Sequence, residues 1–179
     1  ERGEIKGVGK RAVDTIIKNR KEAPFKNIFD VVKKVDLRAA NKKAMENLAL
    51  AGGFDSFEGT HRAQYFNPDG DGIIFLEKII RFGSKFQENQ NSSQTSLFGG
   101  DTDQVYQELL IPRAPEWNNL EQLKKEREVV GIYISGHPLD DFKKEMKWFT
   151  NADLSMLKEL KPWINKNLSL AGIINDFQH

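Results

Sequence analysis

The chain has 179 residues, of which 39% are hydrophobic and 30% charged, as is typical of a soluble globular protein. It has no cysteine, which excludes disulfides and thiolate metal sites, and no apolar run nears the ~20 residues of a membrane span. The net charge of +1 hides an asymmetry: residues 1–62 carry 14 Lys or Arg against nine Asp or Glu, whereas residues 63–179 carry 13 against 17. The basic excess favours a polyanionic partner for residues 1–62.

Local signals predict the first three helices. Apolar residues at helical spacing follow Gly9, and Pro24 ends this first helix. Asn27 and Asn41 are expected to cap the next two helices through their side-chain oxygens. Gly52-Gly53 ends the third helix, because glycine tolerates the left-handed backbone of a helix C-terminus.

Two further helices complete a predicted helical domain over residues 1–86. The fourth helix is expected to start between residues 56 and 60, with Asp55 as its N-cap. A loop rich in Gly and Asp at 67–72 separates it from the fifth helix, which is expected over 73–86.

The second half is predicted to be a linker, a connector and one strand. Residues 87–104 are rich in Gly, Ser, Asn and Gln and can bury little, so we expect a flexible linker. A small helical connector is expected over 105–166, with helices at 120–130, 140–149 and 154–160 and a strand-like run and turn at 131–139. Apolar alternation over 168–174 predicts the opening strand of a truncated β domain at 167–179. The predicted fold class is therefore mainly α.

The segment Ile5 to Gly9 reads I-K-G-V-G and precedes a helix, which predicts a helix-hairpin-helix. Gly7 and Gly9 lack side chains that would block a phosphate, and the turn around Val8 aims backbone N–H groups outward at the positive end of the following helix. Lys10 and Arg11 add charge beside that end. Such a site grips phosphodiesters without reading bases, so we predict sequence-independent binding to double-stranded DNA. The alternative is that the two glycines only form a turn.

A looser second copy of the hairpin is predicted at Gly52 and Gly53, about 45 residues after the first. The two copies could pair as a pseudo-symmetric unit that holds both strands across a minor groove. Phe54 and Asp55 stand where a glycine and a cation are usual, which leaves a simple helix stop as the alternative. Gly52 and Gly53 are nevertheless retained as candidate DNA-binding residues.

Several sequence words in this order resemble the alpha subunit of bacterial DNA polymerase III, the DnaE type of the C-family replicative polymerases. They are IKGVG, PFKNIFDVVKKVDLR, LALAGGFDSF, QTSLFGG, Trp117 and EREVVGIYISGHPL. The resemblance covers nearly the whole chain and implies that residues 167–179 open an OB domain. It also implies a cytoplasmic setting, no membrane contact, and contacts with other replicase subunits through a full-length protein. In that family the catalytic aspartates, expected to use Mg²⁺, lie upstream in the palm, so this piece is predicted to be non-catalytic and to need no cofactor.

The segment Gln94-Thr95-Ser96-Leu97-Phe98 has the form Q-x-x-L-F and is similar to the peptide with which this family binds its sliding clamp. Leu97 and Phe98 could fill a hydrophobic pocket while the Gln94 amide bonds at its rim. Burial of each apolar side chain contributes about 1.5–3 kcal/mol. The alternative is that Leu97 and Phe98 fold back on the domain.

Other readings of the sequence are weaker. The loop at 67–72 resembles the start of a calcium-binding EF-hand, but Lys78 occupies the position of the bidentate Glu, and the three histidines are too scattered for a metal site. The hairpins alone would also suit the scaffold of a DNA-repair enzyme, and the peptide alone a clamp-binding adaptor. An error-prone paralogue of the same polymerase is harder to exclude than these two alternatives, although the Q-x-x-L-F pattern favours the main replicative enzyme. The chain begins without Met and enters directly into a motif, so we expect a piece of a longer protein.

Overall fold

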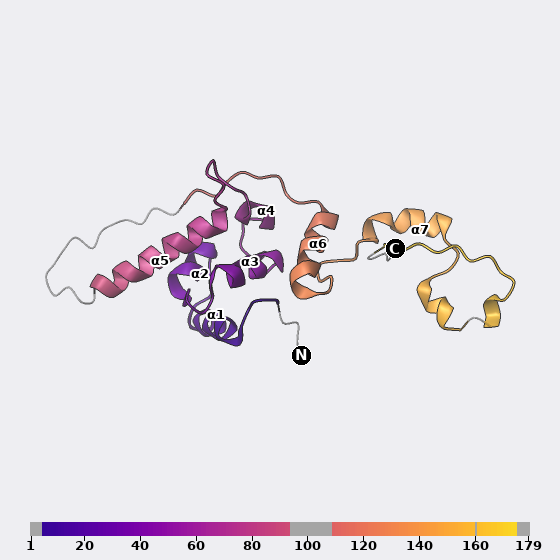
Figure 1. Ribbon diagram of the computed structural model, residues 1–179, viewed down its shortest axis with the longest axis horizontal. Helices are drawn as coiled ribbons and strands as arrows, with labels where there is room; N and C mark the ends of the chain where they lie inside the picture. Colours follow the sequence, from indigo (N-terminus) through magenta and orange to yellow (C-terminus); the bar gives the residue numbers. More distant parts are fainter. Residues whose placement is uncertain (1–4, 94–108, 160, 175–179) are drawn as a thin grey trace. The chain divides into compact units, whose positions relative to one another are not determined.

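The computed structural model describes residues 5–93, 109–159 and 161–174, and it divides into two units, residues 1–132 and 133–179 (Figure 1). The described residues are mainly helical and contain only one isolated β-bridge, between Pro68 and Ile74. In the first unit they form α1 (Lys10–Glu22), α2 (Ile28–Lys34), α3 (Lys42–Leu50), α4 (Arg62–Tyr65), α5 (Phe75–Ser93) and α6 (Asn119–Val130). The predicted mainly helical class is thus confirmed. No described helix is long and apolar enough to span a membrane.

Asparagine side chains cap three of these helices. The Asn27 side chain accepts a hydrogen bond from the Asp30 amide at 2.9 Å, and Asn41 accepts one from the Ala44 amide at 3.0 Å, as predicted. Asn118 caps α6 in the same way, with its oxygen 2.8 Å from the Glu121 amide. Each cap satisfies an amide that has no partner inside its helix.

The core of the first unit forms mainly where α2 packs against α5. Phe29 and Phe82 meet edge to face with ring centroids 5.6 Å apart. Gly83 permits the close approach, because an added Cβ would lie 2.6 Å from both the Cβ and the carbonyl oxygen of Val32. The other buried members come from all five N-terminal helices and their loops, and include Ala12, Ile28, Val31, Val35, Met45, Ala49, Phe54, Tyr65, Leu76 and Ile79.

Helix α5 is displaced and longer than predicted. It starts at Phe75 rather than residue 73 and continues through Ser93, so residues 87–93 are helical and the prediction that they belong to a linker was wrong. The Gln87 amide explains part of this extension, since it donates to the carbonyls of Val32 and Val35, each at 2.8 Å. A polar residue counted as linker-forming thus satisfies two carbonyls at the end of α2. Residues 94–104 lie outside the described residues.

Helix α6 packs on the first unit and not within a separate connector. Its Leu123 and Val129 are buried, and it contacts α3. Upstream of it, the rings of Trp117 and Phe66 lie 5.6 Å apart, and the Gln64 amide donates to the Pro112 carbonyl at 3.1 Å. The unit boundary falls after residue 132, so the predicted connector over 105–166 is divided between the two units.

The second unit contains short helices: η1 (Asp140–Phe142), α7 (Lys143–Phe149), η2 (Leu154–Lys158) and η3 (Lys161–Trp163). The strand-like run predicted at 131–139 is a series of bends and turns, and residues 168–174 form no strand. A strand needs a partner strand, whereas within the described part of the chain the hydrogen bonds to residues 167–169 come from one residue, Asn151. Its amide N–H donates to the Ser169 carbonyl at 3.1 Å, and its side-chain oxygen accepts from the Ser169 amide at 2.8 Å.

Candidate nucleic-acid interface

The first predicted hairpin lies between residue 5 and the start of α1. Gly7 has φ +72°, a left-handed conformation that favours glycine, and a Cβ there would lie 3.2 Å from the Asn47 amide nitrogen. Val8 is half buried and packs against the core. The hairpin therefore faces solvent at its glycines while its central apolar residue anchors it to the domain.

Two contacts from distant helices hold this hairpin in place. The Lys6 amide donates to the Val129 carbonyl at the end of α6, at 2.8 Å, and the Asn47 side-chain amide on α3 donates to the Lys6 carbonyl. Asn47 is buried, with 2% of its surface exposed. Sequence reasoning missed both anchors, although a polar Asn on the buried stripe of α3 is a signal that could have been noticed.

No side chain among the described residues caps the start of α1. Gly9 is its N-cap residue, with extended backbone, and an added Cβ there would meet no described atom within 4 Å. Among the described residues, the amide N–H groups of Gly9, Lys10 and Arg11 have no acceptor. These amides stand at the positive end of the helix dipole, where an anion is stabilised.

Lys10 and Arg11 add positive charge to these amides. Both side chains are exposed, and neither forms an ion pair within the part of the chain that the structure describes. The structure therefore brings together five of the predicted DNA-binding residues: Gly7, Val8, Gly9, Lys10 and Arg11.

The second predicted hairpin differs from the first because its glycine amides form hydrogen bonds within the protein. Gly52 has φ +84°, and its amide donates to the Ala49 carbonyl at 3.1 Å, while the Gly53 amide donates to the Leu48 carbonyl at 2.8 Å. Both N–H groups therefore satisfy the C-terminal carbonyls of α3. A Cβ on Gly52 would lie 2.2 Å from the Arg62 guanidinium, so a packing requirement accounts for this glycine.

The prediction that Asp55 caps the fourth helix was wrong. Helix α4 starts at Arg62, later than predicted, and follows the N-cap residue His61. The Asp55 carboxylate instead binds the guanidinium of Arg62 through both oxygens, with the Arg62 Nε 2.9 Å from Oδ1 and Nη2 2.6 Å from Oδ2. A tertiary ion pair thus replaces the expected local cap.

Arg62 is the centre of a buried polar network that the sequence did not predict. Its Nη1 donates to the Leu50 carbonyl at 3.1 Å and to Glu126 Oε1 at 3.2 Å. Burial lowers the pKa of Arg62, but the hydrogen bonds and negative charges of Asp55 and Glu126 outweigh it, so the pKa is raised and the guanidinium stays charged. The network fixes the loop after α3 and joins it to α6, whose last turn anchors the first hairpin.

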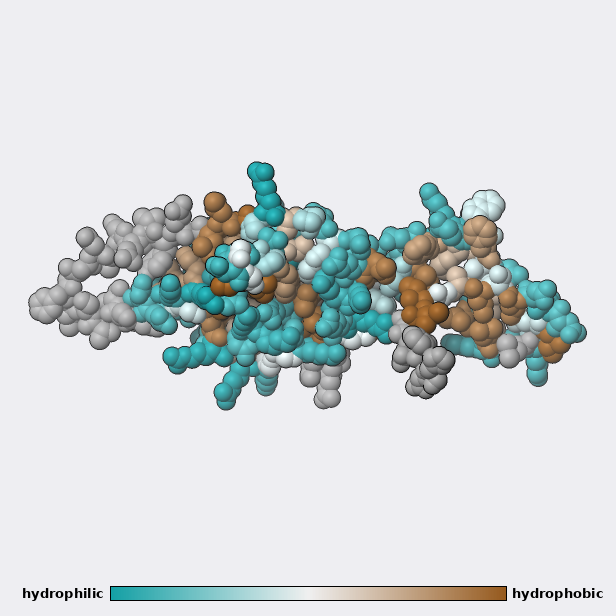
Figure 2. All heavy atoms as spheres, turned by 45° about the horizontal axis from the view of Figure 1, so that its top comes forward, coloured by the Kyte–Doolittle hydropathy of each residue, from teal (hydrophilic) through white to brown (hydrophobic). Residues whose placement is uncertain are grey.

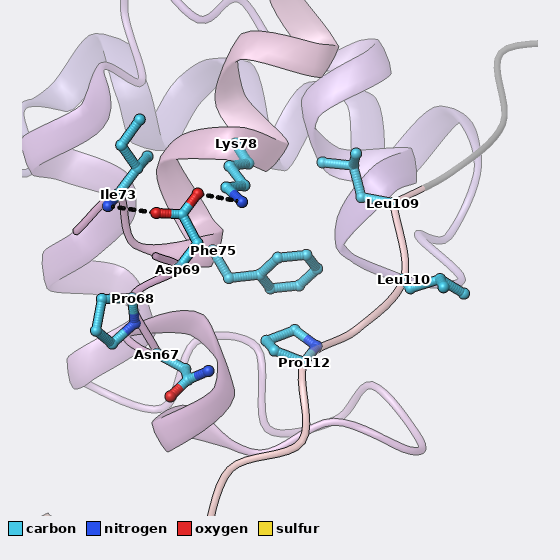
Figure 3. A pocket seen from close by; sticks show the side chains of 9 residues that line it. All are labelled: Asn67, Pro68, Asp69, Ile73, Phe75, Lys78, Leu109, Leu110 and Pro112. Atoms are coloured by element: carbon cyan, nitrogen blue, oxygen red, sulfur yellow. Dashed lines mark hydrogen bonds and ion pairs between the residues drawn. The ribbon is translucent and has the colours of Figure 1, made fainter. Parts of the chain in front are cut away.

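A pocket of about 180 Å³ lies on the first unit, and none of its lining residues is a predicted DNA-binding residue (Figure 3). The residues that line it are Asn67, Pro68, Asp69, Ile73, Phe75, Lys78, Leu109, Leu110 and Pro112. In the loop that resembles an EF-hand, the Asp69 carboxylate accepts from the Ile73 amide at 2.9 Å and pairs with Lys78. The described residues contain no group of three or more side chains suited to hold a metal ion.

Comparison with known proteins shows which families this chain is similar to. The family model described as helix-hairpin-helix motif matches residues 3–65, which span both predicted hairpins. The chain is also similar to curated relatives named DNA polymerase III subunit alpha, among them those of three bacteria. It is 32% identical to that of Vibrio cholerae over 96% of this chain, 33% identical to that of Campylobacter jejuni over 98%, and 31% identical to that of Borreliella burgdorferi over 96%.

The chain therefore carries a helix-hairpin-helix motif. Over almost its whole length it is homologous to a segment of the alpha subunits of DNA polymerase III, so the resemblance predicted from the sequence words is confirmed. The chain spans 14% of the length of each of these three relatives.

Proposed function

We propose that this chain is a DNA-binding region of a bacterial replicative polymerase, and that its first hairpin grips the backbone of duplex DNA without reading sequence. The observation that carries the proposal is the uncapped start of α1, where three amides lack acceptors among the described residues and two exposed cations adjoin them. The homology to polymerase alpha subunits supports it.

A phosphate oxygen fits this place for electrostatic and steric reasons. The amides of Gly9, Lys10 and Arg11 can donate to it, and the helix dipole and two side-chain charges stabilise its negative charge. Open space at Gly9 lets the backbone approach. In this arrangement the amides and cations contact only phosphate oxygens of the DNA backbone. The affinity for duplex DNA should therefore depend on salt through counterion release and hardly on base sequence. Because the Gly52 and Gly53 amides are engaged in capping α3, we assign the phosphate contact to the first hairpin.

The sharpest test replaces Gly9 by Asp. An Asp side chain at the N-cap can accept a hydrogen bond from the Arg11 amide, and its negative charge lies at the positive end of the helix dipole. It should therefore stabilise the helix by about 0.5–1 kcal/mol and repel a phosphate from the same place. We expect unchanged or higher thermal stability and a loss of duplex binding in fluorescence anisotropy. The matched control is Asn118→Asp, which adds the same charge at the N-cap of α6. Equal DNA affinity for the two variants would refute the proposed site.

We also propose that Gln94 to Phe98 tether the protein to a sliding clamp. This segment lies outside the described residues, so support comes from its Q-x-x-L-F pattern and from the homology. In a calorimetric titration with a bacterial clamp, Leu97→Ala with Phe98→Ala should abolish binding. The control is Leu110→Ala with Ile111→Ala, an adjacent pair of exposed apolar residues. Loss of binding in both double variants, or in neither, would remove the segment from the mechanism.

We further propose that nucleotidyl transfer, with its Mg²⁺ ions, and contacts with other replicase subunits belong to parts of the full-length cytoplasmic protein outside these 179 residues. The homology to polymerase subunits of much greater length supports this division. A primer-extension assay of the chain with Mg²⁺ and nucleotides should give no incorporation. Any incorporation of nucleotides would contradict this assignment of nucleotidyl transfer to other parts of the full-length protein.

A further inference from the structure

One cation beside the first hairpin comes from a different helix and was not among the predicted site residues. Lys43 lies in the first turn of α3, and its Cγ would be 3.6 Å from a Cβ at Gly7. Its aliphatic stem therefore runs beside the turn, and only two methylene groups separate this contact from the ammonium. The side chain is exposed and forms no ion pair among the residues that the structure describes.

The placement of Lys43 is fixed by the same contacts that fix the hairpin. Asn47, one helical turn after Lys43 on α3, holds the Lys6 carbonyl through its side-chain amide. Residues four apart lie on one face of a helix, so Asn47 and Lys43 both face the turn. The distance from Lys43 to Gly7 is thus set by the packing of the domain and not by the hairpin sequence.

The neighbouring lysine is in a different electrostatic state. Lys42 pairs with Glu77 on α5 and lies 3.9 Å from Glu46, and these carboxylates raise the pKa of Lys42. Two adjacent lysines on α3 therefore carry equal charges, but one is neutralised within the protein and the other is directed to the hairpin. Only the second is available to a polyanion.

We propose that Lys43 supplies a further cation to the phosphate site of the first hairpin, so that duplex DNA is held by charges from α1 and α3 together. The proposal rests on the proposed function of the hairpin. A flexible lysine stem allows the ammonium to reach a phosphate next to the one held by the amides. The contact carries no base information, so its contribution should be equal for duplexes of different sequence.

The test measures anisotropy of a labelled 20-base-pair duplex across a salt titration. Lys43→Gln keeps the Cγ that packs beside Gly7 and removes the charge. We expect it to weaken binding about three- to tenfold at low salt and to lower the slope of log affinity against log salt by about one. The matched control, Lys42→Gln, removes the same charge from the next residue and should leave the slope unchanged. Melting temperatures of both variants check the fold.

A third variant, Lys10→Gln with Arg11→Gln, separates this inference from the proposed function. If the double variant lowers the slope but Lys43→Gln behaves like Lys42→Gln, then Lys43 makes no contact and the hairpin site stands. If neither the double variant nor Lys43→Gln changes the slope, then the hairpin site itself is refuted. Equal losses for Lys42→Gln and Lys43→Gln would show a general charge effect and would also overturn the specific role of Lys43.

Discussion

Glu126 on α6 accepts a hydrogen bond from the Arg62 guanidinium at 3.2 Å, and the two side chains are 0% and 5% exposed. They are 64 residues apart in the sequence. The pair makes α6 part of the hairpin domain, and the last turn of α6 holds the Lys6 amide. The phosphate site that we propose therefore depends on a residue more than one hundred positions away.

Arg62→Leu should destabilise the protein by about 3–5 kcal/mol, because it leaves the buried carboxylate of Glu126 without its guanidinium. The free energy of unfolding from urea denaturation measures this effect. Arg81→Leu is the control, since it breaks an exposed ion pair with Glu77 and should change stability by less than about 1 kcal/mol. Similar losses for the two variants would show that the buried network contributes little.

Substitution of a glycine by alanine should destabilise the protein much more at the second hairpin than at the first. Gly52→Ala places a Cβ 2.2 Å from the Arg62 guanidinium at φ +84°, so we expect a loss of about 2–4 kcal/mol. Gly9→Ala enters open space at φ −75° and should cost no more than about 1 kcal/mol. Thermal unfolding of both variants is the measurement. A larger loss at Gly9 than at Gly52 would contradict these structural roles.

The sequence predicted those features that depend on neighbouring residues. Asn27 and Asn41 were predicted as caps because a cap bonds an amide three residues away. The ion pair between Asp55 and Arg62 could not be read from a local rule, and an N-cap was predicted in its place. Gly9 and Gly52 look alike in the sequence, but Gly52 adopts φ +84° and packs against Arg62, whereas Gly9 has φ −75° and open space around it.

Composition and alternation also failed where tertiary contacts decided the outcome. Residues 87–93 are polar enough for a linker, yet Gln87 binds the end of α2 and the helix continues. Residues 168–174 alternate like a strand, but the described chain offers them no partner strand. An alternating pattern predicts which side chains could face a core. A strand nevertheless forms only where a second strand completes its backbone hydrogen bonds.

The stability of the first unit should depend on Asp69 at acidic pH. Hydrogen bonds from Lys78 and from the Ile73 and Asp71 amides lower the pKa of Asp69 below its ordinary value of 3.8. A carboxyl with a lowered folded-state pKa stabilises the protein fully above its unfolded pKa, and this stabilisation is lost as pH falls through the folded pKa. Asp69→Asn should therefore reduce stability at pH 7 and flatten the loss of stability below about pH 3.8.

Urea denaturation at several pH values measures the effect of Asp69. Asp71→Asn is the control, because it removes the same charge from an exposed residue in the same loop. The Asp69 carboxylate and its hydrogen bonds remain in this variant, so the loss of stability that depends on Asp69 should remain as well. Equal flattening in the two variants would show that the loop responds to net charge alone.

The second unit should tolerate the loss of large apolar side chains that would unfold an ordinary domain. Pro138 is its only buried residue among those described, whereas Trp148 and Phe149 on α7 are 81% and 77% exposed. Figure 2 shows hydrophobic side chains gathered on the surface of this unit. Since these rings bury little area, Trp148→Ala with Phe149→Ala should leave the urea midpoint of the first unit unchanged and reduce binding of the dye ANS, which reports exposed apolar surface.

Phe29→Ala in the first unit is the matched control for this double variant. Phe29 is buried and packs on Phe82, so its truncation should cost about 3–5 kcal/mol. The second unit has no comparable core among its described residues, and its apolar surface area is already in contact with water. Deleting an exposed ring therefore removes no burial. If the double variant lowered the urea midpoint as much as Phe29→Ala, then Trp148 and Phe149 would have to be buried in solution, and the open arrangement of the second unit would be refuted.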